Sequence, residues 1–452
     1  MIAMKVFGLR VLLVCLMFLA DDAADGQLLD KEKSGGVRME LYHRDELAAS
    51  KADVFTRIRQ AVQRSKLRAK HLAFKAQAFA TSNSSRHLTD SFTTPVSSGQ
   101  GDYLMQLQLG TPVTSFHAIA DTGSDLVWVQ CRPCSSCYQT NDPIFNPSSS
   151  SSYSLLACNS QACEALGSNG FCGVTNCKYN YGYGDGSFTS GDFSTETITM
   201  SDTSGGSMAI SSFAFGCGHN NQGSFPGNAG GLVGLGRGPI SLISQLSHVI
   251  QERFSYCLVS FGDSSTTTSP LFFGSAAMLS GSRIGVTPIL NAAVPTFYYV
   301  GITGIIVGGS ALKIPKSSFD SSSAGTIFDS GTTITYFEDK AYSIVKSAFS
   351  RKISLPTVDG SQYGLDLCYD ISSHPSFQPP SFTIHLSGAS LSPPSANYFV
   401  LVDTNVLCLA ILSSGTSGNP SILGNILQQN YHVLYDVTKS QISFQQAQCD
   451  TL

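Results

Sequence analysis

A short pattern that occurs twice constrains the fold of this 452-residue chain more than any other feature. It consists of two apolar residues, Asp, a hydroxyl residue, Gly and a second hydroxyl residue, at residues 119–124 and again at 327–332. Each copy continues into an apolar, β-rich run. A single Asp-Thr-Gly is typical of an ordinary turn, because Asp and Gly both favour turns. Two copies with matching flanks indicate two halves that are built alike.

A second landmark repeats in the same order. Gly-Leu-Val-Gly at 231–234 follows the first Asp, and Ser-Ile-Leu-Gly at 421–424 follows the second. Only 13% of the residues are charged, and 42 are Gly, which favours many short strands joined by turns over long charged helices. We therefore expect an all-β protein with a few short helices, made of an N-terminal lobe at 94–280 and a C-terminal lobe at 281–452.

Residues 1–24 have the features of a secretory signal peptide. Lys5 and Arg10 precede an apolar run at 11–20, and small and acidic residues follow it. The run is too short to span a bilayer, so a retained membrane anchor is the less favoured alternative. We expect a secreted protein with no stable membrane association.

The two ends of the chain differ in charge. Residues 1–94 hold 15 basic residues (Lys and Arg) and 10 acidic residues (Asp and Glu). The whole chain has 27 basic and 31 acidic residues, so residues 95–452 hold 12 basic and 21 acidic ones. Residues 45–79 combine basic residues with a helical apolar pattern. Such a helix could simply be solvated. We favour a propeptide at 25–93 whose basic helix docks on an acidic body, with Val54, Ile58, Val62 and Leu67 on one side. Protonation of carboxylates would loosen this contact, so we expect activation by acid.

The stretch at 81–100 is rich in Ser and Thr and predicts a flexible connection where cleavage takes place. It contains the one clean glycosylation sequon, Asn83-Ser84-Ser85. We expect a glycoprotein precursor whose mature form carries no N-glycan.

The cysteines indicate disulfides. Of 13 Cys, Cys15 lies in the leader, and the remaining 12 form an even set suited to six disulfides in an oxidising compartment. Seven fall in an insert at 131–177, so one of them must pair outside it, and Cys217 is the nearest candidate. The Cys-x-x-Cys-x-x-Cys run at 131–137 is similar to a metal-ligand run, but no His is interleaved to complete a zinc set.

The two repeated aspartates, Asp121 and Asp329, predict acid–base chemistry. Two carboxylates brought face to face share one proton and titrate as a unit. One can accept a proton from water while the other donates to a carbonyl oxygen, which allows hydrolysis without a covalent intermediate. The loop residues suit this role: Gly123 and Gly331 permit close approach, Ser124 and Thr332 can orient the carboxylates, and Thr122 and Ser330 can tie the two loops together.

Other chemistries fit the sequence less well. There is no His-Glu-x-x-His zinc motif and no Gly-x-Ser-x-Gly nucleophile elbow, and the histidines after residue 95 show no ligand spacing. The glycine-rich stretch at 230–238 lacks a P-loop lysine and a βαβ setting. The body has no basic patch for nucleic acid. We expect no metal, no cofactor and no nucleic-acid partner.

At these residues the sequence resembles the pepsin-like aspartic proteases, and more closely their nepenthesin-like branch in plants. The resemblance covers residues 103–449 and rests on the two Asp motifs, the two Gly landmarks and Trp128. The Cys-rich insert before Tyr-Gly-Asp-Gly-Ser at 183–187 is what points to the branch. Upstream, Leu-Tyr-His-Arg-Asp at 41–45 is similar to a motif of propeptides in that branch.

The resemblance implies a bilobal, pepsin-like fold in which a cleft between the lobes binds an extended polypeptide. Asp121 and Asp329 would be the catalytic pair, and Tyr183 would lie at the tip of a flap with Trp128 as its hydrogen-bond partner. Tyr181 is the competing flap residue. Ser330 stands where many relatives have Thr, and it keeps the hydroxyl. The protein would be a monomeric zymogen inhibited by its own propeptide, and it would act in the apoplast, with the vacuole as the alternative.

Two further interpretations accompany the resemblance. Position in the chain suggests the disulfide pairs Cys368–Cys408 and Cys257–Cys449. The alternative to an enzyme is a catalytically silent binding or inhibitor protein of the plant cell wall on the same fold. The intact pair of Asp motifs and the flap Tyr favour the enzyme.

Overall fold

The computed structural model describes residues 36–44, 53–82, 103–183, 187–202, 205–223, 225, 229–260, 268–281, 283–292, 294–320, 325–415 and 418–452. The expected signal peptide, the sequon at Asn83 and the flap tip at 184–186 lie outside the described residues. The elements below belong to one unit, Gly35–Leu452.

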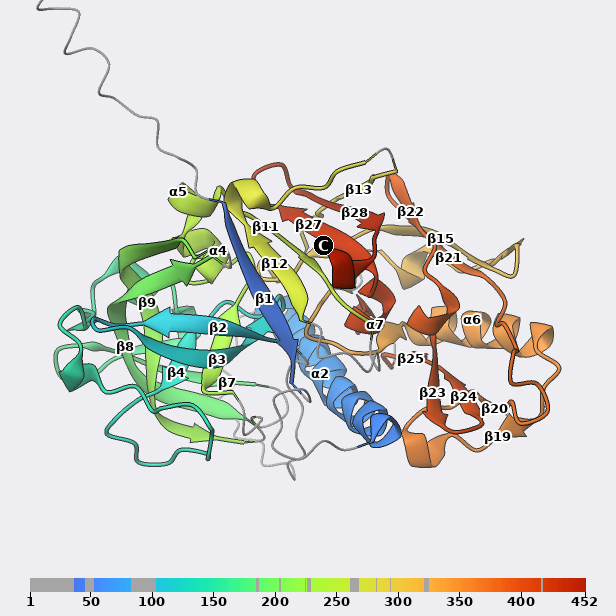
Figure 1. Cartoon of the computed structure of the whole chain (residues 1–452), viewed down its shortest axis with the longest axis horizontal. Coiled ribbons are helices and arrows are strands. Elements are labelled where there is room, and N and C mark those ends of the chain that lie inside the picture. Colours follow the sequence, from blue (N-terminus) through green and yellow to red (C-terminus); the bar gives the residue numbers. More distant parts are fainter. Residues whose placement is uncertain are drawn as a thin grey trace, which may run out of the picture. The chain divides into compact units, whose positions relative to one another are not determined.

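A 15-stranded sheet runs through the N-terminal half and takes in strands from both ends of the chain (Figure 1). In sheet order its strands are β13 (Gly285–Pro288), β28 (Gln441–Gln446), β27 (Tyr431–Asp436), β11 (Arg253–Cys257), β12 (Ser269–Phe273), β1 (Val37–His43), β2 (Tyr103–Leu109), β3 (Thr114–Asp121), β10 (Gly231–Gly234), β4 (Trp128–Gln130), β9 (Ser207–Gln222), β8 (Phe188–Ser201), β7 (Cys177–Gly182) and β6 (Gly170–Cys172), with β5 (Ser154–Leu155) paired to β8.

Smaller sheets make up the C-terminal half. One has the order β14 (Tyr299–Val300), β17 (Thr326–Phe328), β26 (Ser421–Leu423), β18 (Thr335–Phe337) and β25 (Ile411–Ser413). Another has β16 (Ser310–Ala311), β15 (Ile302–Val307), β21 (Phe382–Leu386) and β22 (Ala389–Leu391). A third has β19 (Thr357–Val358), β20 (Cys368–Asp370), β24 (Val406–Leu409) and β23 (Phe399–Asp403).

Helices are few in the body, as the composition predicts. The α-helices are α2 (Val54–Ser82), α3 (Gln161–Glu164), α4 (Leu242–Gln245), α5 (Ser247–Ile250), α6 (Asp339–Lys352) and α7 (Asn425–Gln428). Short 3₁₀ turns are η1 (Pro147–Ser149), η2 (Gly167–Asn169), η3 (Gly274–Ala276), η4 (Lys316–Ser318), η5 (Ser361–Tyr363), η6 (Ser395–Asn397) and η7 (Cys449–Thr451). Helices α4 and α5 follow one another directly within residues 242–250.

The two halves use the same local construction. In the first, β10 pairs parallel to β3, so that Gly234 lies beside Asp121, and antiparallel to β4. In the second, β26 pairs parallel to β17 and antiparallel to β18. The repeated Gly landmarks are therefore the strands that flank the two Asp-bearing strands, which explains why the landmarks recur in the same order.

The segment before residue 94 contributes a strand that the sequence analysis missed. Strand β1 lies between β2 and β12 and pairs antiparallel with both. Its side chains alternate, with Val37, Met39 and Leu41 buried in the core. The motif at 41–45 thus begins on a core strand. The neighbouring helix α2 spans 29 residues, beginning and ending later than the expected range of 45–79.

All 12 cysteines from Cys131 to Cys449 form disulfides, as their even number predicts. The disulfides are Cys131–Cys217, Cys134–Cys137, Cys158–Cys172, Cys163–Cys177, Cys257–Cys449 and Cys368–Cys408. The two pairs suggested by position are confirmed, and so is Cys217 as the outside partner of the insert.

Candidate active site

The two repeated aspartates occupy equivalent positions. Asp121 is the last residue of β3, and Asp329 directly follows β17. Both side chains are buried, with exposed fractions of 1% for Asp121 and 0% for Asp329. The apolar residues before each Asp form strands because they pack on both faces, and the Asp-hydroxyl-Gly sequence then turns the chain.

Each loop holds its own carboxylate by hydrogen bonds. Ser124 Oγ donates to Asp121 Oδ2 at 2.6 Å, and Thr332 Oγ1 donates to Asp329 Oδ2 at 2.6 Å. The backbone N–H of the Gly two residues after each Asp donates to its Oδ1, at 2.9 Å from Gly123 and 3.2 Å from Gly331. These donors fix the orientation of each carboxylate.

The two loops are also tied to each other. Thr122 Oγ1 donates to Asp329 Oδ1 at 3.0 Å and accepts from the backbone N–H of Ser330, also at 3.0 Å. A Cβ on Gly331 would lie 2.8 Å from Asp121 Oδ1, and one on Gly123 would lie 3.2 Å from Asp329 Oδ1. Only glycine therefore allows each loop to approach the carboxylate of the other.

Residues of α7 support the second loop. Asn425 Nδ2 donates to the carbonyl oxygen of Ser330 at 2.9 Å, and Gln428 Nε2 donates to that of Asp329 at 3.3 Å. Neither residue is predicted from the sequence to have a role in the site. The one sequence feature that could have indicated such a role is their position just after the second Gly landmark, which ends at Gly424.

An arginine from α2 lies between the two aspartates. Arg68 Nη1 donates to Asp121 Oδ2 at 3.1 Å, and its Nη2 also donates to Asp121 Oδ1. On the other side, Arg68 Nε donates to Asp329 Oδ2 at 3.2 Å. The guanidinium is buried and bridges both carboxylates with its fork of N–H donors. Burial acts to raise the pKa of Asp121, but the charge and hydrogen bonds of Arg68 outweigh it and lower that pKa.

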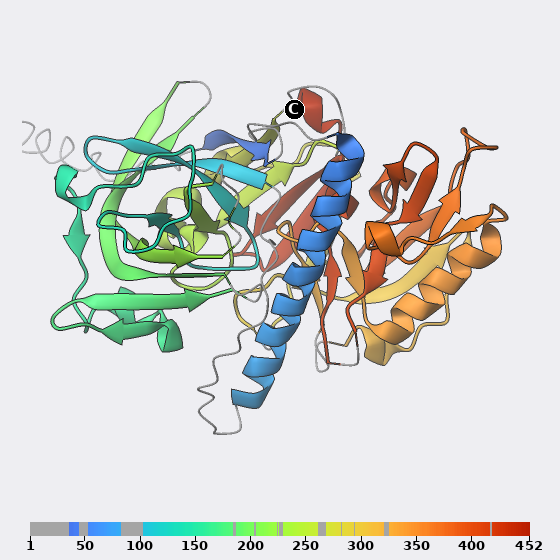
Figure 2. The same cartoon turned by 90° about the horizontal axis from the view of Figure 1, so that it is seen from below.

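Helix α2 is held against the C-terminal half by further contacts. The backbone N–H of Ile334 donates to Ser65 Oγ at 2.8 Å, and Thr333 Oγ1 donates to the carbonyl oxygen of Ala61 at 3.4 Å. Ile58, Val62 and Leu72 pack into an apolar cluster of that half. Of the expected apolar face, Ile58 and Val62 are buried, and Val54 and Leu67 are half-buried. Figure 2 shows the helix lying across the β-rich body.

The flap residues meet the same helix. Trp128 Nε1 donates to Tyr183 Oη at 2.8 Å, and both side chains are buried. The ring centroids of Tyr183 and His71 of α2 are 6.4 Å apart. Lys75 Nζ of α2 donates to Tyr181 Oη at 3.2 Å. Tyr183, rather than the competing Tyr181, therefore has the Trp128 hydrogen bond.

Arg68 and Lys75 belong to the basic residues at 45–79, whose individual contacts the sequence pattern does not indicate. A helical period alone does not tell which basic residue meets which carboxylate, since the docking angle is set by tertiary packing. Within the described ranges, no three His, Cys, Asp or Glu residues group as ligands for a metal ion. Nor does any described helix combine the length and apolar character needed to cross a membrane.

The chain is similar in sequence to known plant proteins. Two family models match, described as "Xylanase inhibitor N-terminal" at residues 103–275 and "Xylanase inhibitor C-terminal" at 297–446. The chain is 48% identical to aspartic proteinase nepenthesin-1 and 45% identical to nepenthesin-2, both of Nepenthes gracilis, over 79% of this chain and 80% of each relative. It is 38% identical to aspartyl protease family protein 2 of Arabidopsis thaliana, over 95% of this chain and 90% of that protein.

Solved structures share the fold at low identity. The crystal structure of edgp matches with a TM-score of 0.64 and 20% identity, over 77% of this chain and 92% of that one. Basic 7S globulin from soybean matches with a TM-score of 0.63 and 20% identity, over 78% and 94%. The expected bilobal, pepsin-like architecture is thereby confirmed.

Proposed function

This chain belongs to the nepenthesin-like aspartic proteases and is an aspartic-type endopeptidase; from that premise we propose that it is made as an inactive precursor whose own helix α2 blocks the active site until acid releases it. Asp121 and Asp329 are the catalytic pair, and the substrate is a polypeptide bound in extended form. The enzyme works as a monomer, in the apoplast or alternatively in the vacuole, after secretion directed by residues 1–24.

The chemistry follows from the carboxylate pair once Arg68 has left. Asp121 and Asp329 then share one proton, because two adjacent carboxylates do not both ionise easily. The ionised member accepts a proton from water, which attacks the scissile carbonyl, while the protonated member donates to the carbonyl oxygen. Ser124 and Thr332 keep the two carboxylates oriented throughout.

The observation that carries the precursor proposal is the bridging of both aspartates by Arg68. The guanidinium takes up the hydrogen-bonding positions at the carboxylate oxygens where water and the scissile carbonyl must bind. Its positive charge also favours ionisation of Asp121, which removes the shared proton. Arg68 therefore blocks both the space and the protonation state required for hydrolysis.

Acid acts on this arrangement through His71 as well as through the carboxylates. His71 is 5% exposed, and neither ring nitrogen has a hydrogen-bond partner in the described part of the chain. Burial, then the charges of Lys75 and Arg68, keep the pKa of His71 well below its ordinary value. The titratable groups that face it are Arg68 and Lys75 on its own helix and Tyr183 on the flap.

The sign of the pH effect follows from linkage. A docked helix holds His71 neutral, whereas a released helix has a free histidine with a pKa of about 6.5. Below that pH the released state binds more protons, so docking weakens as pH falls. The lowered pKa of Asp121 acts in the same direction at lower pH, because its carboxylate must be protonated as Arg68 departs. The precursor is thus held at neutral pH and released by acid.

Arg68→Met tests this proposal. The unprocessed variant should hydrolyse a short peptide at pH 5 at least about tenfold faster than the unprocessed wild type, because a charge-assisted bridge of roughly 1.5–3 kcal/mol is lost. Arg59→Met is the matched control, since Arg59 lies on the same helix and donates to the carbonyl oxygen of Val402 instead. Gel analysis must show that the precursors stay uncleaved during the assay.

Two results would count against the proposal. If the Arg68→Met precursor were as inactive as wild type while matured enzyme was active, Arg68 would not be the block. If matured wild type and its Asp121→Asn variant were equally inactive, the catalytic assignment would fail. The alternative hypothesis, a catalytically silent inhibitor with this fold, would then be favoured. The xylanase-inhibitor names of the two family models are the observation that favours this inhibitor hypothesis.

A further inference from the structure

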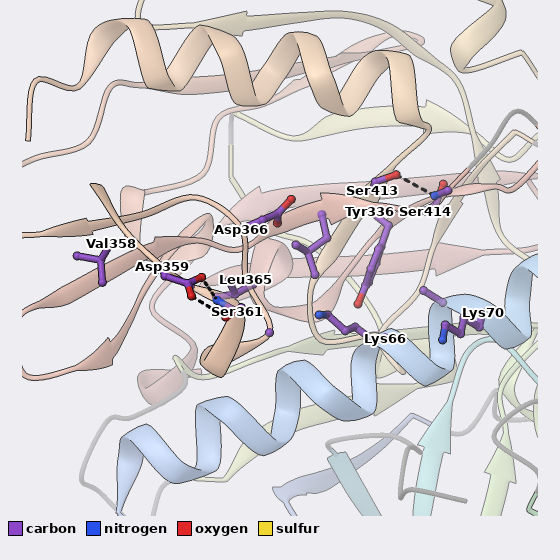
Figure 3. A pocket seen from close by; sticks show the side chains of 15 residues that line it. Lys66, Lys70, Tyr336, Val358, Asp359, Ser361, Leu365, Asp366, Ser413 and Ser414 are labelled. Atoms are coloured by element: carbon purple, nitrogen blue, oxygen red, sulfur yellow. Dashed lines mark hydrogen bonds between the residues drawn. The ribbon is translucent and has the colours of Figure 1, made fainter. Parts of the chain in front are cut away.

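A cavity of about 650 Å³ lies between helix α2 and the C-terminal half of the molecule (Figure 3). Lys66, Ala69 and Lys70 line it from the helix. The opposite wall includes Tyr336, Asp359, Ser361, Leu365, Asp366 and Ser413. Arg68 is not among the lining residues, although Ala69, the next residue of the helix, is.

The charges on the two walls are of opposite sign. The helix supplies two lysines, and the described lining residues of the body include two aspartates but no Lys, Arg or His. Figure 3 shows the side chain of Lys66 turned from the helix toward the loop that carries Asp359 and Ser361. A Cβ on Gly364 of that loop would lie 3.3 Å from Lys66 Nζ, so the ammonium group rests against the loop backbone.

Asp359 is the carboxylate available to a cation in this cavity. The backbone N–H and the Oγ of Ser361 both donate to it at 2.9 Å, and these hydrogen bonds lower the pKa of Asp359. These hydrogen bonds therefore favour its ionised form. Asp366 already accepts from Tyr342 Oη at 2.6 Å and from Lys346 Nζ at 3.3 Å, which offsets its charge.

The position of the cavity connects it with the catalytic pair. Tyr336, on its floor, belongs to strand β18, which follows the Asp329 loop. The helix residues that close the cavity are those on either side of Arg68, which contacts both aspartates. Departure of α2 removes the helix wall and both lysines together, and leaves the wall that carries Asp359.

We propose that this cavity is a substrate subsite that accepts the side chain of a lysine or arginine, and that Lys66 occupies it in the precursor. The inference rests on the proposed function, because α2 must leave for substrate to enter. The long apolar stem of a basic residue lies along Tyr336 and Leu365, and its charged end reaches Asp359. The enzyme then favours polypeptides with a basic residue at one fixed position near the scissile bond.

Paired peptides test the subsite in matured enzyme. Each pair carries lysine or its neutral isostere norleucine at one position, and every position on both sides of the scissile bond is scanned. At one position kcat/KM should favour lysine by about three- to fivefold, which is what a solvent-accessible ion pair yields. The preference should shrink as ionic strength rises, because salt screens exposed charges.

Asp359→Asn should abolish the lysine preference without reducing cleavage of the norleucine peptides. Asp370→Asn is the matched control, because Asp370 accepts from the backbone N–H of Ser372 in the same way, at 2.8 Å, and does not line the cavity. The control should keep the full preference. An equal loss in both variants would reduce the effect to general surface charge and overturn the assignment.

A second readout uses the whole precursor. Lys66→Met and Asp359→Asn should each shift acid release to higher pH, and the double variant should shift it no further than either single one, because both changes remove the same attraction. Fully additive shifts would mean that Lys66 and Asp359 do not attract each other and would overturn the assignment of Lys66 to this subsite. If norleucine peptides were cleaved with no lysine preference at any position, only this subsite would fail. If no peptide were cleaved at all, the proposed function itself would fail.

Discussion

At the scale of single residues, the two aspartates are distinguished by what surrounds them. Each is buried, and each is held by a hydroxyl three residues later and an amide two residues later. The Asp-hydroxyl-Gly-hydroxyl pattern therefore encodes a local hydrogen-bonded loop. This part of the candidate site could be predicted from sequence, because these four donors lie within three residues of the carboxylates that they serve.

Tyr183 offers a test at the same scale. Tyr183→Phe leaves the Nε1–H of buried Trp128 without its acceptor, which costs roughly 1–3 kcal/mol. We expect kcat/KM of the matured enzyme to fall about tenfold or more, with a smaller change in thermal stability, because the flap is held less firmly over the substrate. Steady-state kinetics and thermal unfolding would measure the two effects.

Tyr181→Phe serves as the comparison for that variant. The hydroxyl of Tyr181 accepts from Lys75 of α2, a contact that would be lost with the proposed removal of α2. Its loss should leave kcat/KM within about twofold of wild type. Equal effects of the two substitutions would remove the reason for assigning the flap role to Tyr183 over Tyr181.

At the scale of elements, the segment that we propose as a propeptide contains two described elements with different contacts, β1 and α2. Strand β1 fills a place in the central sheet and buries three apolar side chains, whereas α2 contacts the catalytic loops and the flap. The sequence indicated the helix through its apolar period. It did not indicate β1, because a seven-residue alternating run does not reveal that its neighbours come from residues 103–109 and 269–273.

A prediction on α2 concerns the pH at which it is released. His71→Gln keeps a polar side chain but cannot be protonated, so the contribution of His71 to acid release disappears. We expect the midpoint of acid-induced maturation to move to lower pH, by about half a unit to one unit. The midpoint would be measured from gel time courses at a series of pH values.

His248→Gln is the control for this experiment, since His248 lies on α5 and has no part in α2. It should leave the midpoint unchanged. A His71→Gln precursor that matured at the wild-type pH would show that the carboxylates alone are responsible for the acid response.

At the scale of the whole molecule, disulfides connect parts of the chain that are far apart in sequence. Cys257–Cys449 joins β11 to the last 3₁₀ turn across 192 residues, whereas Cys134–Cys137 closes only three. In the chain-entropy description, the long crosslink stabilises by about 5 kcal/mol and the short one by about 2 kcal/mol. The even cysteine count predicts six disulfides, but proximity in the folded structure decides which cysteines pair with each other.

Replacing both members of one pair by serine tests this difference. The Cys257/Cys449 double variant should lower the midpoint of thermal unfolding clearly more than the Cys134/Cys137 double variant, measured by calorimetry on the precursor at neutral pH. Equal losses would mean that local packing around the sulfurs, rather than the length of the closed loop, sets their contribution to stability.

The sequence by itself determined the duplicated loops, the β-rich class, the even set of cysteines and the basic helix, because each depends on local pattern or on composition. Only the tertiary structure decided that Arg68 is the residue between Asp121 and Asp329, that His71 is buried beside it, and that Lys66 faces the Asp359 loop. The physical reason is the same for all three. The contacts of a helix with a distant part of the chain depend on its rotation and depth in the cleft, and these are set by how apolar side chains such as Val62 and Leu72 pack against residues more than 200 positions away.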